Sequence, residues 1–267
     1  MPKPSDSNSV QKICRILRAL STPDPIRLTD LAVATGLNKS TIVRLLDGLI
    51  DEGFADREPE SRHYRLGDQA IYLGLAMQGR MHLRAPARPW LVRLAARSGD
   101  TSLLSVRSGT EALCLDREFG NYPIQANYLD VGSRRPLGAG AGSLALLAWL
   151  PDDEVAAVLD QLENVWVTRY PRLSRSYLLD QIGQSRHQGF VLLLDVVVER
   201  MGGIAMPVLG VDGRPVGAMS IAALSERLSS RIDFLREALS EAVAALSPTQ
   251  TQTQTQTQTP TQMVSRT

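Results

Sequence analysis

The sequence has few of the residues that build metal or catalytic centres. Its 267 residues include two cysteines, Cys14 and Cys114, and three histidines, His63, His82 and His187. No two histidines have the spacing of metal ligands, so we expect no metal site. The cysteines are far apart and lie inside apolar patterns, which predicts buried free thiols instead of a disulfide or zinc site.

Motifs of enzymes and nucleotide cofactors are also missing. There is no G-x-S-x-G elbow and no GK[ST] phosphate loop. The glycine-rich stretch "GAGAGS" at residues 138–143 lacks both the phosphate-loop lysine and a full dinucleotide fingerprint. The sequence therefore predicts no cofactor and disfavours an enzyme.

Long apolar runs and a strong charge of either sign are absent too. No stretch approaches the length of a membrane span, and the N-terminus lacks the apolar core of a signal peptide, so we expect a cytoplasmic protein without membrane contact. Net charge is +1, and residues 1–80 hold 11 basic against 10 acidic side chains. Evidence for a nucleic-acid partner must therefore come from where the charges lie. With 43% hydrophobic residues, the chain can form one or two domains with real cores.

Three helices are predicted in the first 53 residues. Residues 10–20 have helical apolar spacing after a capping Asn8 or Ser9, and "LTDLAVATG" predicts a short helix capped by Thr29. The third helix follows Asn38 as N-cap and ends at Gly53. Its apolar stripe recurs at positions i, i+3, i+4, i+7 and i+8, and comprises Ile42, Leu45, Leu46, Leu49 and Ile50.

A hairpin is predicted after these helices, because short β-like pieces of "FADREPESRHYRLG" flank the turn-forming "PESR". Two helices with a tight glycine turn, followed by such a wing, indicate a helix-turn-helix whose third helix enters the DNA major groove. Small, hydroxyl and basic groups suit backbone approach, phosphate binding and base contact. The predicted DNA-binding residues are Asn38, Lys39, Ser40, Thr41, Val43, Arg44, Arg62 and Arg65. The alternative is a three-helix bundle with a solvated charged face.

Residues 9–75 resemble the winged helix-turn-helix of IclR-type transcriptional regulators. The resemblance is carried by "GLNKSTIVRLLDGLIDEGF" and, after the wing, by "YRLGDQAIYLG". Asn38 stands where relatives often have proline, but either residue can start a helix.

The rest of the chain predicts an antiparallel sheet with flanking helices. Two helices with a break near "RAPARP" precede five β-type segments, "TSLLSVRSG", "EALCLDREF", "GFVLLLDVVV", "GGIAMPVLG" and "RPVGAMSIAAL". Asp212–Gly213 predicts a tight hairpin between the last two, and helices are expected near 143–150, 152–162, 174–187 and 229–246. The resemblance implies a GAF-like effector-binding domain here.

The predicted fold class is therefore α+β, in four consecutive parts. They are a winged helix-turn-helix (9–68), a linker helix (69–84), a GAF-like domain (85–246) and a Thr/Gln-rich tail (247–267) that we expect to be disordered.

The "GAGAGS" stretch opens an apolar helix, and free N–H groups at a helix start bind anions such as carboxylates. A tight loop packed on the sheet is the alternative. In the family this junction lines the effector pocket. The resemblance implies as pocket residues Ala141, Gly142, Asp195, Met201, Gly203, Ser220 and Ala222. Ser143 and Leu144 replace a common Gly-Lys pair, and Arg200 replaces a common glycine; we expect Arg200 to face solvent.

Together these features predict a sequence-specific transcriptional regulator that binds double-stranded operator DNA as a homodimer or dimer of dimers. We expect a small-molecule effector, an organic acid, to control it. The alternatives are a small-molecule sensor without DNA binding and, less favoured by the sequence, an enzyme.

Overall fold

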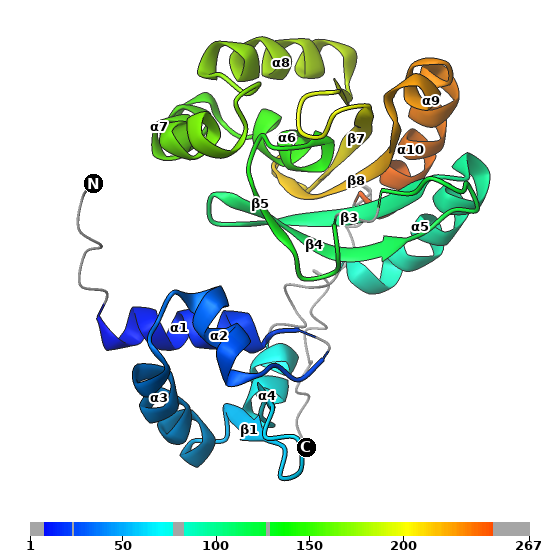
Figure 1. Ribbon diagram of the computed structural model, residues 1–267. Helices are drawn as coiled ribbons and strands as arrows, with labels where there is room; N and C mark the ends of the chain where they lie inside the picture. Colours follow the sequence, from blue (N-terminus) through cyan, green and yellow to red (C-terminus); the bar gives the residue numbers. More distant parts are fainter. Residues whose placement is uncertain (1–7, 23, 77–82, 127–128, 248–267) are drawn as a thin grey trace, which may run out of the picture. The chain divides into compact units, whose positions relative to one another are not determined.

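The computed structural model describes residues 8–22, 24–76, 83–126 and 129–247. The chain divides into two compact units, one up to residue 82 and one from Leu83 onward (Figure 1). Among the described residues, no helix combines the length and apolar content needed to cross a bilayer. The predicted tail from residue 248 lies outside the described residues.

The first unit is a three-helix core followed by a two-stranded wing and a further helix. Its elements are α1 (Ser9–Leu20), α2 (Leu28–Thr35), α3 (Lys39–Asp51), β1 (Ala55–Arg57), β2 (Tyr64–Leu66) and α4 (Gln69–Ala76). The predicted winged helix-turn-helix is confirmed, including the antiparallel pairing of the wing strands. The predicted stripe of α3 packs into one cluster with Ile16, Leu20 and Leu31 of the other helices.

The sequence predicted a helix start correctly where a side chain caps the helix. The Oδ1 atom of Asn8 accepts a hydrogen bond from the Gln11 N–H at 2.9 Å, so Asn8 caps α1. Thr29 is not a cap: α2 begins one residue before it, after Arg27, which makes no capping bond through its side chain. Cys14 is exposed, so the prediction that both thiols are buried is wrong for this residue.

The second unit is a six-stranded antiparallel sheet with helices on both faces. Its strands are β3 (Thr101–Ser108), β4 (Glu111–Glu118), β5 (Arg134–Pro136), β6 (Val191–Leu194), β7 (Met201–Leu209) and β8 (Pro215–Leu224), in the order β5-β4-β3-β8-β7-β6. Its helices are α5 (Arg84–Ser98), α6 (Ala141–Ala148), α7 (Asp152–Arg169), α8 (Arg175–Gln188), α9 (Ser225–Ser229) and α10 (Ile232–Leu246). The α+β fold class and all five predicted strands are confirmed, and β5 is an addition.

The two helical layers of this unit lie on opposite faces of the sheet (Figure 1). Helices α5 and α10 pack against the strands on one face and against each other. Helix α6 packs on the other face, and α7 and α8 join it in one buried cluster with Trp166 and Leu178. In this arrangement the start of α6 lies directly over the central strands.

Three element boundaries differ from the sequence predictions. Two separate helices are present as predicted, but residues 84–89 belong to the second: α5 starts at Arg84 and contains Pro89, and Pro86 lies in the first turn, where no helical N–H bond is needed. Helix α7 continues past Leu162 because Trp166 extends its buried face. The helix predicted over 229–246 is α10, which begins at Ile232, and the short helix α9 before it was not predicted.

Candidate DNA-reading surface and ligand cavity

The start of α3 is held in place by its cap. Asn38 is extended, and its Oδ1 atom accepts hydrogen bonds from the Thr41 N–H at 2.8 Å and from the Ser40 hydroxyl at 2.9 Å. The predicted N-cap role of Asn38 is confirmed. The cap takes up a backbone donor that the helix itself leaves unpaired, and so defines where the first turn begins.

The two sides of α3 differ sharply in burial. Ile42 and Leu46 are 0% exposed and Leu45 and Leu49 are 7% exposed. On the outer side, Lys39, Ser40 and Arg44 are exposed, Val43 is 37% exposed and Thr41 is half-buried. These five residues, Lys39, Ser40, Thr41, Val43 and Arg44, form what we call the reading face of α3. It offers a small apolar group, two hydroxyls and two cations to a partner outside the unit.

The two predicted arginines of the wing are in different situations. Arg62 is exposed at the turn, with a left-handed φ of 55°. Arg65 lies opposite Asp56, and its Nη2 and Nε atoms donate to the Asp56 carboxylate at 2.7 and 3.0 Å. The guanidinium of Arg65 lowers the pKa of Asp56, and Asp56 raises the pKa of Arg65. An Arg65 contact to DNA would therefore compete with this ion pair.

His63 is half-buried between the wing and the start of α2. Its Nε2 atom accepts a hydrogen bond from Arg27 Nε at 2.9 Å. Backbone bonds between Ile26 and Tyr64 at 2.8 Å hold the two segments together. The wing is thus hydrogen-bonded to the start of α2, in addition to the pairing of its own two strands.

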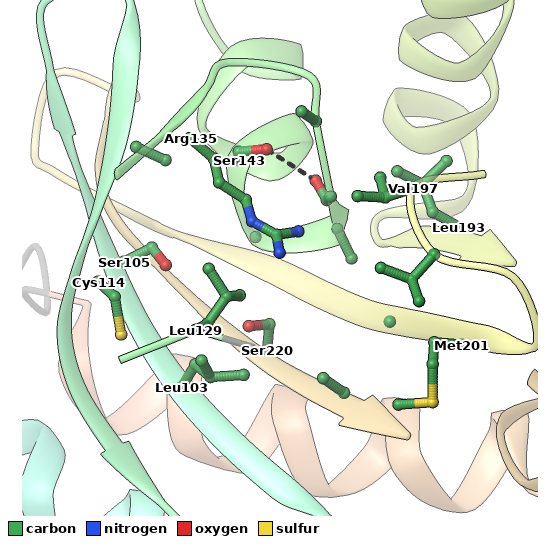
Figure 2. A pocket seen from close by; sticks show the side chains of 18 of the residues that line it. Leu103, Ser105, Cys114, Leu129, Arg135, Ser143, Leu193, Val197, Met201 and Ser220 are labelled. Atoms are coloured by element: carbon green, nitrogen blue, oxygen red, sulfur yellow. Dashed lines mark hydrogen bonds between the residues drawn. The ribbon is translucent and has the colours of Figure 1, made fainter. Parts of the chain in front are cut away.

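A cavity of about 60 Å³ lies in the second unit, between the start of α6 and the central strands (Figure 2). Six of the seven predicted effector residues are in its wall: Ala141, Gly142, Met201, Gly203, Ser220 and Ala222. They come from α6, β7 and β8, which are far apart in the sequence. The fold brings them together at one place.

Asp195 is the seventh predicted residue, and it is not in the described wall. It is exposed, with a left-handed φ of 61°, and its carboxylate accepts a hydrogen bond from the Ser225 hydroxyl at 2.9 Å. Its carbonyl accepts one from Arg172. Asp195 begins the loop after β6, and the following residues, Val196, Val197 and Val198, line the cavity.

The first turn of α6 lies in the wall of the cavity. Gly140 precedes the helix with a φ of 120°, and no side chain in the described parts of the chain caps the first turn. A Cβ atom built on Gly142 would lie 3.2 Å from Ser220 Oγ and 3.4 Å from Ser105 Oγ. The two hydroxyls therefore gather over the first turn, where a larger side chain would displace them.

Sequence reasoning missed several residues of the wall, above all Arg135 and Ser105. Arg135 lies on β5, and Figure 2 shows its guanidinium reaching over the cavity beside Ser143. A Cβ on Gly140 would lie 3.7 Å from Arg135 Nη1, so this cation is next to the start of α6. The pair Arg134–Arg135 before "PLG" is the signal that could have drawn attention to it.

Cys114 also lines the cavity and is 3% exposed, as predicted for a buried thiol. Burial raises the pKa of this thiol to about 11. Away from these groups the wall is apolar, with Leu129, Leu193, Val197 and Met201 around it (Figure 2). Within the described parts of the chain, no three acidic, cysteine or histidine side chains come together in a way that could hold a metal ion.

Comparisons with known proteins match both units. Residues 9–59 match the model of the IclR helix-turn-helix domain, and residues 75–248 match that of the bacterial transcriptional regulator IclR C-terminal domain. The chain is 31% identical over 241 residues to the HTH-type transcriptional regulator XynR of Escherichia coli, covering 90% of this chain and 95% of that protein. It is 25% identical over 242 residues to KipR of Bacillus subtilis, covering 90% and 96%.

Solved structures agree on the fold. An IclR homologue of Microbacterium hydrocarbonoxydans, crystallised with 4-hydroxybenzoate, superposes with a TM-score of 0.71 at 23% identity, over 90% of this chain and 97% of that one. An IclR regulator of Alicyclobacillus acidocaldarius gives 0.69 at 23% identity, over 89% and 96%. The matched families and relatives are transcriptional regulators and not enzymes.

Proposed function

Because the chain belongs to the IclR family of bacterial transcriptional regulators, we propose that it binds operator DNA through the reading face of α3 and the wing. We further propose that a small organic acid, bound in the cavity of the second unit, controls this binding. The observation that carries the first proposal is the division of α3 into a buried apolar side and an exposed polar side.

Each residue of the reading face suits a specific contact. The guanidinium of Arg44 can donate two hydrogen bonds to a guanine edge, and Val43 can contact a thymine methyl group. Lys39, Ser40 and Thr41 lie in the first turn, where a cation, two hydroxyls and helix N–H groups suit the phosphate backbone. Asn38 contributes by capping this turn.

The wing supplies a second contact region. Arg62 is exposed at its turn and can reach phosphate or the minor groove without breaking a described ion pair. Arg65 is the weaker candidate, because phosphate binding would cost its hydrogen bonds to Asp56. We therefore rank Arg62 above Arg65 as a DNA contact.

The polar end and the apolar end of the cavity each suit one part of an organic acid. The uncapped start of α6, the Ser105 and Ser220 hydroxyls and Arg135 favour an anionic group. The apolar wall beyond them suits the remaining carbon skeleton. The Microbacterium relative was crystallised with 4-hydroxybenzoate, which is a small organic acid. Such a ligand regulates only if it binds one DNA-binding state more tightly than the other, because equal affinity shifts no population.

We also propose that the protein acts as a homodimer or a dimer of dimers, in the cytoplasm. On α4 three consecutive large apolar residues are exposed: Ile71 by 60%, Tyr72 by 64% and Leu73 by 58%. Large apolar side chains exposed in this number on one short helix are consistent with a protein–protein contact. Two-fold dimers also match the symmetry of palindromic operators. Light scattering of the full chain tests this state directly.

The DNA proposal is tested by mapping the genomic fragments that the purified chain protects, then titrating one fragment at fixed salt. Arg44→Ala should weaken binding by about 1–3 kcal/mol with unchanged melting temperature. Arg15→Ala removes an exposed cation from α1 and serves as the control, with a much smaller effect. Equal affinity of wild type and Arg44→Ala would remove Arg44 from the reading face.

The effector proposal is tested by a thermal-shift screen of carboxylic acids that includes 4-hydroxybenzoate, followed by operator titration with each hit. A hit should stabilise the wild type, change its operator affinity and fail to stabilise Gly142→Val, whose side chain would press on Ser220 and Ser105. Gly183→Ala serves as a control, because a Cβ on this α8 glycine meets nothing within 4 Å. Equal stabilisation of all variants would place the ligand elsewhere.

A further inference from the structure

The start of α2 and the turn of the wing border an open hollow on the first unit. It is lined by Arg27, Leu28, Thr29, Ser61, Arg62 and His63. Both arginines are exposed, and none of the described lining residues is acidic. Two hydroxyls, of Thr29 and Ser61, lie beside these cations. The hollow therefore has the composition of a site for one phosphate group of a nucleic-acid backbone.

One contact inside this hollow depends on the protonation state of a side chain. The Nε atom of Arg27 donates a hydrogen bond to the Nε2 atom of His63 at 2.9 Å, which requires that Nε2 carry no proton. An imidazolium donates through both ring nitrogens and accepts through neither. Protonation of His63 would therefore break this bond and place two cations side by side. The chain without DNA is thus arranged around a neutral His63.

The neighbouring segments hold His63 in this position. Backbone bonds join Ile26 and Tyr64 at 2.8 Å, and the His63 N–H donates to the Ser61 hydroxyl at 3.1 Å. The same hydroxyl donates to the Glu58 carboxylate at 2.6 Å. Among the described residues, Arg27 is the one hydrogen-bonded to the ring. The charged side chains at the start of α2 and on the turn of the wing are Arg27, Asp30, Arg57, Glu58, Glu60 and Arg62.

A phosphate in the hollow would change which form of His63 is favoured. In a helix-turn-helix, the helix before the reading helix crosses the DNA backbone, and in this chain that helix is α2. A phosphate oxygen can accept hydrogen bonds from Arg27 and from a protonated His63 together, and both bonds are then assisted by charge. The anion stabilises the second positive charge that Arg27 alone would oppose.

From this arrangement we infer that operator binding takes up a proton at His63, so that the protein binds DNA more tightly as the pH falls through the neutral range. The inference rests on the proposed DNA binding and adds Arg27 and His63 to the residues that hold the operator. The proton comes from the solvent. The complex carries more protons than the separate chain and DNA, and a lower pH therefore favours the complex.

The test is titration of the full chain with a protected operator fragment at pH 6, 7 and 8 and constant ionic strength, followed by fluorescence anisotropy. The wild type should bind about 3- to 30-fold more tightly at pH 6 than at pH 8, because uptake of one proton changes an association constant by at most about tenfold per pH unit. Calorimetry at pH 7, in two buffers of different ionisation enthalpy, should show net uptake of up to about one proton for each bound operator half-site.

Two opposite replacements of His63 isolate its contribution. His63→Gln keeps an acceptor for Arg27 but cannot be protonated, and should bind at pH 6 as weakly as the wild type does at pH 8. His63→Lys is a permanent cation, and should bind at pH 8 as tightly as the wild type does at pH 6. Arg27→Met should weaken binding by about 3- to 10-fold and lower the salt slope by about one.

His187 supplies the matched control. It is exposed in the last turn of α8, in the second unit, and His187→Gln should keep the full pH dependence of the wild type.

The outcomes separate this inference from the DNA-binding proposal. Operator binding by the wild type with no proton uptake and no pH dependence would overturn the inference and leave the DNA proposal standing. A pH dependence that persists in folded His63→Gln and His63→Lys would assign the proton to another group and remove His63 from the site. If the wild type binds no DNA fragment at any of the three pH values, both proposals fail. The calorimetric proton count needs no variant, so it decides even if a replacement of His63 melts early.

Discussion

Asp56 of β1 and Arg65 of β2 are direct cross-strand partners, and the Asp56 carboxylate accepts two hydrogen bonds from the Arg65 guanidinium, at 2.7 and 3.0 Å. The pair lies on the wing, with about half of each side chain exposed, 47% for Asp56 and 56% for Arg65. One charge that would attract DNA is thereby neutralised on the surface proposed to meet it.

Asp56→Asn should therefore strengthen operator binding, because it releases Arg65 and removes a negative charge near the phosphates. We expect a gain of about two- to fivefold at low salt that shrinks as salt rises. Asp51→Asn makes the same charge change at the far end of α3 and is the control. An equal gain from both variants in a salt-dependent anisotropy titration would mean that only net charge matters.

The same ion pair predicts a small pH effect on stability. Arg65 lowers the pKa of Asp56, so the unfolded state binds its proton first as the pH falls. The stabilisation by the pair is fully present above the usual carboxyl range and is lost as the pH falls through the lowered pKa of Asp56. Because both groups are half exposed, the effect is small. Urea unfolding of wild type and Asp56→Asn should therefore differ least at acid pH.

The two sides of α3 should respond oppositely to truncation. Leu46 is 0% exposed, and Leu46→Ala should lower the free energy of unfolding of the first unit by about 2–5 kcal/mol through cavity formation. Val43, at 37% exposure, should lose little stability on Val43→Ala but should lose operator affinity. Urea unfolding with operator titration separates these effects, and an unchanged unfolding curve for Leu46→Ala would show that the helix is turned differently.

Replacing Arg200 should change the stability of the second unit through its backbone conformation. It has a φ of 60°, which glycine adopts freely and β-branched residues resist. We expect Arg200→Gly to raise the free energy of unfolding of the second unit by about 0.5–1 kcal/mol and Arg200→Val to lower it by about 1–2 kcal/mol. The reverse order in thermal melts would show that the Arg200 side chain outweighs backbone strain.

The two cysteines should differ in reactivity. Cys14 is exposed, whereas Cys114 is buried with its pKa raised to about 11. At neutral pH we expect iodoacetamide to label Cys14 in the native chain and Cys114 only after unfolding. Mass spectrometry of the labelled peptides gives the result. Rapid native labelling of Cys114, matching that of Cys14, would contradict the buried cavity wall.

Cys114 also predicts how alkali affects stability. The pKa of its thiol rises from the ordinary value of 9.0 to about 11 in the folded chain, so the unfolded state loses its proton first as the pH rises. Stability contributed by the neutral thiol is intact below pH 9 and declines as the pH rises to about 11. Cys114→Ala should remove this component of the alkaline slope, and an unaltered slope would argue against it.

In the DNA-binding unit, the local sequence pattern was sufficient to predict the buried side of α3 and its N-cap. The helical spacing of Ile42, Leu45, Leu46 and Leu49 determined which side of α3 is buried, and hence which side is exposed. The Asn38 cap was predictable for the same reason: its hydrogen bond reaches only three residues along the chain. What pattern could not supply was the partner of Arg65, because cross-strand pairing depends on the register of the wing.

The cavity was predicted only as far as the family resemblance reached. Ala141, Met201 and Ser220 are in its wall as expected, but Asp195 is not: it has a left-handed φ, and its carboxylate accepts a hydrogen bond from Ser225 instead. Arg135 has no sequence signal of comparable strength, because β5 is three residues long and has no apolar alternation to orient it.

The sequence by itself determined most of the helices and strands and the two faces of α3, since each depends on interactions between residues a few positions apart, and its motifs indicated the class of protein. Only the tertiary structure decided which polar groups meet in the cavity. Ser105 and Arg135 come together there through the pairing of β3 with β4 and of β4 with β5, and Ser220 through the pairing of β8 with β3. Strand order and register are properties of the whole sheet, and no local stretch encodes them.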